Sequence, residues 1–402
     1  MIKKKYFFYN FNFNSKKFSR NLNKTKTLFT KLKEELKNGE IPLLNSFEKE
    51  FELSFSNSTI KKFSKFENII IIGMGGSILG TKCLYSFLKH KIKKKVFFFD
   101  NLDSSLYSQF KKIKNLKKSC FVVISKSGNT LETITNLSVI FSKNLFKNKL
   151  IIITEIADSH LMTIGNKYNA EIIEHKEFIG GRYSVLSESG MLPASLMGLN
   201  PHKFKNLQSN INNKNFVSSL IQNVASIVTL NDDRVTNSVI LSYNSCLNNL
   251  GYWYQQLVAE SLGKQGKGIN PILSFCPKDH HSLLQLYLDG PRDKFFTFFN
   301  SSKRENKFKI SRDAIPNNMK FLKNKNLEFI INAQCNAVKN IFKLKGIPFR
   351  QITFKRKNEE ELGEIFTFFV LETILLSRLM NVNPFDQPAV EQVKIETRKI
   401  LR

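Results

Sequence analysis

Short apolar runs alternate with segments of helical length between Asn68 and Ile173, and this alternation limits the possible folds more than any other feature. The runs read NIIII, VFFFD, FVVIS, LIIIT and EII. Short apolar strands that alternate with helical segments are typical of βαβ units around a parallel sheet. The pattern therefore predicts a doubly wound α/β domain in the first half of the chain.

A second series of strand candidates follows, at residues 238–243, 271–275, 295–299 and 349–354. Beyond Glu359 the sequence ELGEIFTFFVLETILLSRLM is apolar with helical periodicity, so we expect a C-terminal helix that packs across the second sheet. The polar, Asn-rich stretch at 208–215 is expected to be a connector. The predicted fold class is α/β, with two doubly wound parallel-sheet domains and a C-terminal helical segment.

The chain has 402 residues, which is enough for two domains with cores of their own. We expect an N-terminal extension or helical arm at 1–45, a first sheet domain at 46–205, a second at 215–358, and helices packing on the domains at 359–402.

Several classes of protein are disfavoured by composition. No apolar run approaches the roughly 20 residues that span a bilayer, so we expect no membrane partner. The basic start MIKKKYFFYN lacks the unbroken apolar stretch and the cleavage site of a signal peptide, which favours a cytoplasmic protein. The five cysteines lack paired spacing, so neither a disulfide framework nor a metal site is expected.

The formal net charge of +29 raises the question of a polyanionic partner. Lys, Asn, Ile and Phe are abundant along the whole chain, which favours a general bias and a solvated basic surface. Because no nucleic-acid motif or platform of aromatic and basic residues is present, we expect no nucleic acid partner.

The stretch VVISKSGNTLETI changes abruptly from apolar residues to Ser125, Ser127, Asn129 and Thr130. A helix is expected to begin directly afterwards, and the free N–H groups of a helix N-terminus bind phosphate. Gly128 lets the backbone approach a ligand closely. Ordinary N-capping would need only one such residue, so four of them favour a phosphate site.

An earlier turn in IIIIGMGGSILG has a similar form, with Gly73, Gly75 and Gly76 after a strand and Ser77 at a helix start. Neither an ATP loop nor a dinucleotide fingerprint is present, because the third glycine of the latter falls on Ile78. A glycine turn can serve only for packing. Together with the serine-rich loop it predicts a small phosphorylated ligand at the carboxyl ends of the strands.

Six motifs in order give the chain a resemblance to the glucose-6-phosphate isomerase, or phosphoglucose isomerase, family. They are GMGGSILG, SKSGNTLET, GGRYS, AESLGK, HSLLQL and NPFDQPAVEQVK, from about residue 68 to 394. The resemblance implies two sugar-isomerase (SIS) domains and conversion of an aldose to a ketose by proton movement between C1 and C2, without a cofactor or metal. The implied substrate is a sugar phosphate, glucose 6-phosphate or fructose 6-phosphate.

Glu260 lies at the edge of an apolar stripe in YWYQQLVAESLGK. Partial burial makes a carboxylate a better base, as proton abstraction requires. Spacing alone favours a surface pair with Lys264, four residues on. The resemblance instead implies that Glu260 moves the proton through a cis-enediol.

His281 lies in KDHHSLLQL, and a lone histidine is usually structural. An imidazole can both donate and accept a proton near neutral pH, as opening a pyranose ring requires. The resemblance implies this role for His281 and leaves His280 as a neighbour.

In NPFDQPAVEQVK, Pro388 suits the first turn of a helix, with Gln387 at its start and Lys394 seven residues on. A solvent-facing lysine is the simplest interpretation of Lys394. The resemblance implies that Lys394 lies at the sugar ring and Gln387 near the phosphate. Ala389 stands where many relatives have glycine, so the local turn can differ.

Arg182 follows two glycines in GGRYS, and a fixed guanidinium in a dry pocket stabilises an enediolate. A salt bridge to Glu188 or to another surface acid is the alternative. The resemblance favours a catalytic Arg182. It also implies that the phosphate or neighbouring hydroxyls are held by Gly76, Ser77, Ser125, Lys126, Ser127, Asn129 and Thr130.

The resemblance further implies a homodimer in which His281 acts across the interface. Three alternatives stay open from the sequence: a sugar-phosphate-binding regulator without catalysis, a nucleic-acid-binding protein that uses the positive charge, and an isomerase of another sugar phosphate such as mannose 6-phosphate.

Overall fold

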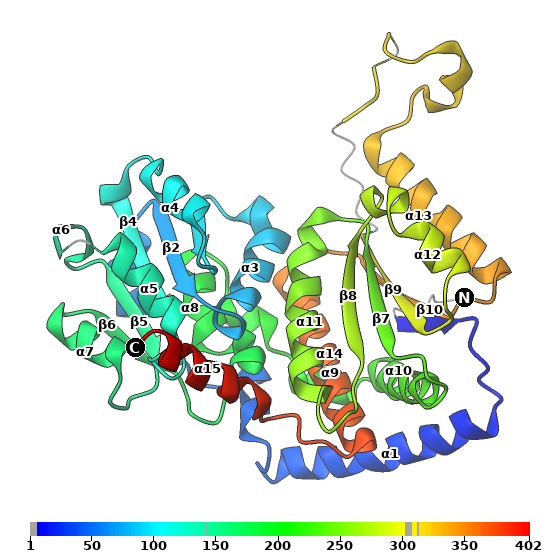
Figure 1. The fold of residues 1–402 in the computed structure, drawn as a ribbon, viewed down its shortest axis with the longest axis horizontal. Helices are drawn as coiled ribbons and strands as arrows, with labels where there is room; N and C mark the ends of the chain where they lie inside the picture. Colours follow the sequence, from blue (N-terminus) through cyan, green and yellow to red (C-terminus); the bar gives the residue numbers. More distant parts are fainter. Residues whose placement is uncertain (1–5, 142, 302–307, 312) are drawn as a thin grey trace.

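The computed structural model describes residues 6–141, 143–301, 308–311 and 313–402. Within them, two five-stranded sheets lie in the two halves of the molecule (Figure 1). The first contains β2 (Asn68–Gly73), β3 (Lys95–Phe99), β4 (Ser119–Ile124), β5 (Leu150–Thr154) and β6 (Glu171–Glu174). The second contains β1 (Tyr6–Tyr9), β7 (Asn237–Ser242), β8 (Asn270–Phe275), β9 (Lys294–Ser301) and β10 (Phe349–Phe354).

The α-helices of the first half are α2 (Asn57–Ser64), α3 (Gly76–Leu88), α4 (Ser104–Lys111), α5 (Leu131–Ile140), α6 (Lys143–Phe146), α7 (His160–Lys167) and α8 (Glu188–Leu196). The remaining α-helices are α1 (Lys16–Lys37), α9 (Leu207–Asn212), α10 (Lys214–Asp232), α11 (Asn248–Leu262), α12 (Leu284–Asp289), α13 (Leu327–Leu344), α14 (Glu359–Met380) and α15 (Ala389–Ile400). Short 3-10 helices are η1 (Pro42–Phe47), η2 (Lys89–Lys91), η3 (Leu116–Lys118), η4 (Gly181–Leu186), η5 (Pro201–Phe204), η6 (Ser245–Leu247), η7 (Lys278–His281) and η8 (Asn317–Leu322).

The first sheet is entirely parallel, in the order β3-β2-β4-β5-β6. From β2 the chain first adds β3 on one side and then β4, β5 and β6 on the other, so the strand order reverses between β2 and β4. Open α/β sheets bind ligands at such a point. Side chains alternate between two faces: Ile69 and Ile71 pack with α3 and α8, whereas Ile70 and Ile72 pack with α5 and α7. This confirms the predicted doubly wound domain.

The second sheet has the order β1-β10-β9-β7-β8, and β7 to β10 are parallel. The edge strand β1 is antiparallel and comes from the N-terminal extension, where the sequence predicted no strand. The helix α1 then packs along α10 (Figure 1). The N-terminal arm is therefore partly built into the second sheet.

One hydrophobic core joins the two halves, because α3 of the first half packs against α11 of the second. The predicted C-terminal helix α14 covers the second sheet, with Phe369 contacting Phe299 at 6.1 Å between ring centroids. The Asn-rich stretch predicted as a connector is mostly helical instead: it forms α9 and the start of α10. Leu207 and Ile211 are buried there, so packing stabilises a helix that polar composition disfavours.

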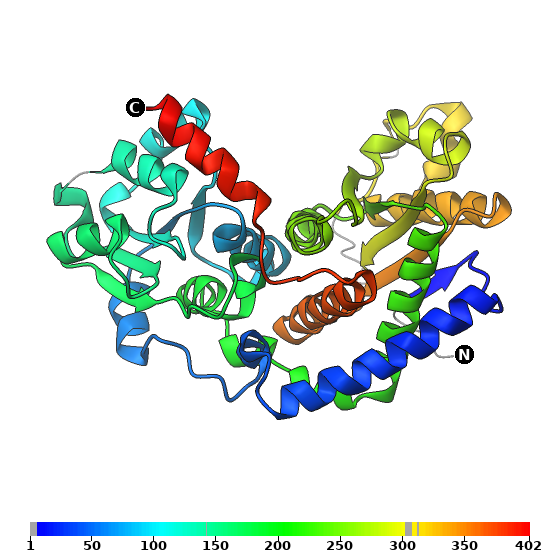
Figure 2. The same cartoon turned by 60° about the horizontal axis from the view of Figure 1, so that its bottom comes forward.

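The last helix, α15, contains no buried residue. In both views it lies over the first-sheet half and joins α14 through a single extended segment (Figure 1 and Figure 2). No helix among the described residues combines the length and the apolarity needed to span a membrane.

Candidate active site

The glycine turn after β2 brings two loops together. A Cβ added to Gly76 would lie 2.2 Å from the carbonyl carbon of Gly181 and 2.5 Å from the amide nitrogen of Arg182. Only glycine allows this approach. Gly76 therefore fixes the position of the loop that carries Arg182, and Ser77 follows in the first turn of α3.

The loop after β4 gathers hydroxyl groups at the N-terminus of α5. The Oγ of Ser125 lies 2.8 Å from the Oγ1 of Thr130, and the Oγ of Ser127 accepts from the amide of Asn129 at 3.3 Å. Thr130 occupies the N-cap position without a side-chain capping bond. This leaves the first N–H groups of α5 for an anion.

Gly128 has a φ of +64°, and a Cβ there would lie 2.2 Å from the Oγ of Ser159, so this position requires glycine. Lys126 points elsewhere: its Nζ donates to the carbonyl of Glu177 at 2.7 Å and pairs with Glu155 at 3.5 Å. The candidate anion site of this loop therefore consists of its hydroxyl groups and the N-terminus of α5, without the ammonium group of Lys126.

Arg182 is the centre of the site, and its side chain is only 2% exposed. Its Nε donates to the Oγ of Ser261 at 2.8 Å. Its Nη1 donates to Oε2 of Glu260 at 3.2 Å and to Oε1 of Gln387 at 2.7 Å. Its Nη2 donates to the carbonyls of Pro384 and Asp386. All five guanidinium N–H groups can thus be satisfied within the protein.

Glu260 forms an ion pair with Arg182, while its other oxygen accepts from Nε2 of Gln256 at 2.9 Å. The Glu260 side chain is 32% exposed, so it lies at the edge of the core as predicted. Lys264 pairs with Asp386 at 2.7 Å instead of Glu260, and Glu188 accepts from the amide of Ser54 instead of pairing with Arg182. The acid that pairs with Arg182 is Glu260 itself. The predicted Arg182 and Glu260 are therefore brought together.

Three further residues complete this cluster and were not singled out from the sequence. Ser261 and Tyr183 are linked by a hydrogen bond of 2.9 Å, and the Tyr183 hydroxyl also donates to Pro384. Gln256 could have been found, because it lies four residues before Glu260 on one helix.

A cavity of about 460 Å³ opens beside Glu260 and is also lined by Lys264, Asp386 and Gln387. This volume suits a small ligand. Among the residues that the structure describes, no group of three or more His, Cys, Asp and Glu side chains is arranged to hold a metal ion.

Lys394 and His281 lie outside the cluster. Lys394 is on α15, 59% exposed, and its Nζ contacts Glu391 at 2.6 Å. His281 is exposed on η7, which follows β8 in the second sheet. Its neighbour His280 bonds to the hydroxyl of Tyr243 at 2.7 Å, and burial, followed by the proximity of His281, lowers the pKa of His280.

These features define a class: a two-sheet α/β protein of the SIS type, with a hydroxyl-rich loop after β4 and a paired carboxylate and guanidinium. The phosphoglucose isomerase family model matches residues 45–275, more than half of the chain. The glucose-6-phosphate isomerase of Methanocaldococcus jannaschii is 35% identical over 343 residues, covering 83% of this chain and 84% of the relative. The probable glucose-6-phosphate isomerase of Methanococcus maripaludis is 33% identical and covers 92% of this chain and 86% of the relative. The chain belongs to the phosphoglucose isomerase family.

Solved structures agree on the fold. A hypothetical protein from Thermus thermophilus has a TM-score of 0.81 at 22% identity, covering 96% of this chain and 97% of that one. A glucose-6-phosphate isomerase from Chlamydia trachomatis has a TM-score of 0.71 at 17% identity, covering 86% of this chain and 71% of that one.

Proposed function

We propose that this protein interconverts glucose 6-phosphate and fructose 6-phosphate, and that Glu260 moves the proton between C1 and C2. The contact of 3.2 Å between Glu260 and Arg182 carries the proposal. The glycine turn after β2 lies against the Arg182 loop at Gly76 and, at Gly73, against Ile124, the last residue before the hydroxyl-rich loop. The reaction needs both parts: an anchor for the phosphate and a base for the carbon-bound proton.

Glu260 removes the proton from C2 of the open-chain aldose. The electron pair forms the double bond between C1 and C2, and the C1 oxygen takes up a proton, which gives the cis-enediol. Return of a proton to C1, with loss of the proton from the C2 hydroxyl, gives the ketose. The amide of Gln256 holds the second oxygen of Glu260 and so fixes the orientation of the base.

Arg182 stabilises the negative charge that develops on the substrate oxygens. Because its N–H groups already have acceptors, a substrate oxygen must replace one of them. Gln387 is the acceptor that can be replaced at lowest cost, since its side chain belongs to an exposed residue outside the core. Arg182 thus acts from a fixed position, which favours preorganised stabilisation.

The phosphate is assigned to Ser125, Ser127, Thr130 and the N-terminus of α5, with Asn129 and Gly76 in support. The oxygen of Asn129 accepts from the amide of His160 at 3.0 Å, which leaves its side-chain NH2 group for the ligand. Ring opening is assigned to His281 with Lys394, and both residues must approach the cluster.

A second copy of the chain would supply His281, because this residue is exposed on η7 and lies outside the cluster of Arg182 and Glu260. Two aromatic side chains after β9 support such a homodimer: Phe308 is 71% exposed and Phe321 is 68% exposed. Residues 313–322 project from the second-sheet half (Figure 1). We place the enzyme in the cytoplasm, and no disulfide joins its five cysteines.

Steady-state turnover of fructose 6-phosphate tests the proposal, with glucose 6-phosphate detected by a coupled dehydrogenase. The wild-type protein should be active, and Glu260→Gln should lower kcat by about a thousandfold because the base is lost. Glu67→Gln is the control, since Glu67 pairs with Lys118 at the surface. Near-normal turnover by a folded Glu260→Gln variant would overturn the assignment.

A further inference from the structure

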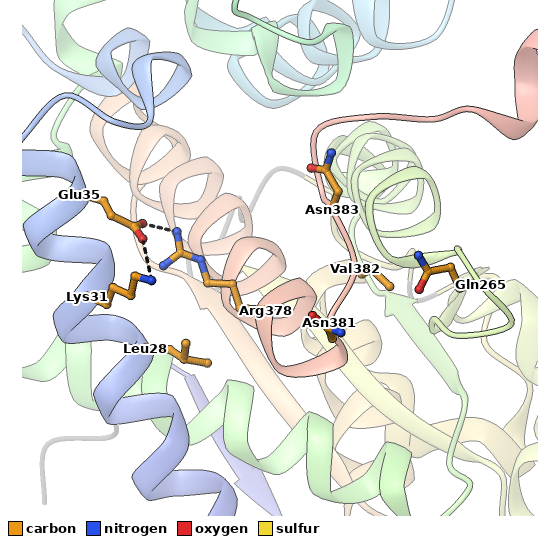
Figure 3. Close-up of a pocket in the computed structure, with 8 residues that line it drawn as sticks. All are labelled: Leu28, Lys31, Glu35, Gln265, Arg378, Asn381, Val382 and Asn383. Atoms are coloured by element: carbon orange, nitrogen blue, oxygen red, sulfur yellow. Dashed lines mark hydrogen bonds and ion pairs between the residues drawn. The ribbon is translucent and has the colours of Figure 1, made fainter.

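The segment Asn383–Gln387, which we call the strap, connects the end of α14 to α15 and lies between two cavities. One is the cavity beside Glu260, and the other, of about 420 Å³, lies between α1 and the end of α14. Asn383 and Gln265 line both. Figure 3 shows the second cavity, with Gln265 on the opposite side from Lys31. Asn383 at the start of the strap therefore borders open space on two sides, and Asp386 and Gln387 border the cavity beside Glu260.

Packing holds only part of the strap. Pro384 is buried, and the ring of Phe385 lies 5.9 Å from the ring of Tyr183 between centroids. Asn383, Asp386 and Gln387 are exposed, so polar contacts are left to hold them.

Polar contacts hold the strap at two places. Arg182 and Tyr183 both donate hydrogen bonds to the carbonyl of Pro384. Lys264 binds the carbonyl of Asn383 and pairs with the carboxylate of Asp386 at 2.7 Å. The Lys264 side chain is only 12% exposed, whereas that of Asp386 is 51% exposed. Because of its hydrogen bond to Lys264, the pKa of Asp386 lies below its ordinary value.

Lys264 lies four residues beyond Glu260, just past the end of α11. One helix thus presents the proposed base and, directly after it, the cation that binds the strap. The position of the strap is set relative to Glu260, and Gln387 at its end reaches Arg182 at 2.7 Å.

We infer that Lys264 and Asp386 are positioning residues. Their ion pair, which we call the latch, holds the strap at the site. It thereby sets the position of Gln387 and of α15, with Lys394, relative to Glu260. This inference rests on the proposed function. Neither residue is assigned a contact with the reacting atoms, and both act through the strap.

A charge-reversal cycle on the full chain tests the latch. Lys264→Asp and Asp386→Lys are made singly and together, and steady-state kinetics on fructose 6-phosphate are measured. Each single change should lower kcat/KM about tenfold, mainly through KM, and the double variant should recover most of the loss because the pair is restored in reverse. The matched control is the same cycle at Lys399 and Glu396, an exposed ion pair of 3.1 Å on α15, which should show no coupling.

Hydrogen exchange of peptides from the strap and α15 provides a readout besides activity. Exchange should be faster in each single variant and return toward the wild-type rate in the double variant. Asp386→Asn is the milder change if a reversal prevents folding, and it should show the same loss of protection. Unchanged kinetics and exchange in the single variants would overturn the latch.

A second result would also overturn the latch: loss of activity in both single variants without recovery in the double variant would mean that Lys264 acts on the substrate itself. An inactive wild-type protein would refute the proposed function instead. The exchange measurement would still decide whether the pair holds the strap.

Discussion

Arg182 and Lys394 are both cations assigned to the same site, yet their surroundings differ sharply. Arg182 is 2% exposed and donates to five acceptors, which come from α11 and the strap. Lys394 is 59% exposed, and its ammonium contacts Glu391 on its own helix. One cation is fixed before a substrate arrives, and the other has to be brought to it.

This difference divides the site into two parts. The fixed part contains Arg182, Glu260 and the loops of the first sheet, and it would stabilise the enediolate without reorganisation. The movable part is α15, the exposed helix that carries Lys394, and it would complete the site around the substrate. Substitutions in the fixed part should therefore affect both stability and catalysis, whereas those in the movable part should affect catalysis alone.

The largest effect is expected for Arg182→Lys. Lysine keeps the charge but supplies three donors instead of five, so at least two acceptors would lose their partners. We expect kcat/KM to fall by about a thousandfold and the free energy of unfolding to fall by about 2 kcal/mol. Arg234→Lys serves as the control because Arg234 is an exposed arginine. A variant with normal thermal stability and activity would show that the bonds of Arg182 do not fix the site.

The stability of the fixed part should also depend on pH through His175, a residue that is 1% exposed. Burial lowers the pKa of His175 from 6.5 to about 4. Between these pH values the unfolded chain binds a proton that the folded chain does not, so stability falls as the pH is lowered from 6.5 to 4. The cost reaches on the order of 3 kcal/mol at pH 4.

Chemical denaturation as a function of pH measures this contribution. His175→Leu should reduce the loss of stability between pH 6.5 and 4, because the group that must stay neutral is gone. His202→Leu, at an exposed histidine, should follow the wild-type curve. If the free energy of unfolding fell equally with pH in the wild type and in His175→Leu, burial of His175 would not be the cause of the loss of stability.

Gly76→Ala tests the close packing, within the fixed part, between the glycine turn after β2 and the loop that carries Arg182. The added methyl group would lie 2.2 Å from backbone atoms of Gly181, which cannot rotate away. We expect a loss of roughly 1–3 kcal/mol in the free energy of unfolding and a lower kcat. At Gly180 a Cβ would meet Tyr183 at an ordinary 3.5 Å, so Gly180→Ala should be tolerated. Equal melting temperatures for the two variants would contradict the close approach.

The smallest effect is expected for Lys394→Gln. Because the side chain is exposed, the melting temperature should not change, but kcat should fall about tenfold if the lysine assists ring opening. Lys399→Gln, one turn further along α15, should leave kcat unchanged. An unaltered kcat for Lys394→Gln would mean that Lys394 takes no part in catalysis and that the site consists of the fixed part alone.

Much of the fold could be predicted because its central strands are buried on both faces. Such strands appear as continuous apolar runs, as in β2 and β4. The edge strand β1 has only four residues, and its pairing with β10 is a long-range contact that local sequence does not encode. The helix α9 was missed for a related reason: Leu207 and Ile211 are its only buried residues in an otherwise polar segment.

The loop at Ser125 could be singled out because four polar side chains follow a buried strand directly, whereas Glu260 and Arg182 are proposed from the resemblance to the family, since their spacing alone favours ordinary ion pairs. The contacts that fix Arg182 could not be predicted. Its bonds to the carbonyls of Pro384 and Asp386 join backbone atoms about two hundred positions away, and a carbonyl is present in every residue. The roles of Lys394 and His281 depend on the position of α15 and on the second copy that we propose, so these roles stay predictions.

Proton exchange with solvent tests the central claim most directly. Fructose 6-phosphate is incubated with the protein in D2O, and deuterium at C1 and C2 is followed by NMR. If Glu260 carries the proton through an enediol, the wild-type protein should introduce solvent deuterium at the reacting carbons, and Glu260→Gln should not. Deuterium incorporation by Glu260→Gln at the wild-type rate would contradict the account.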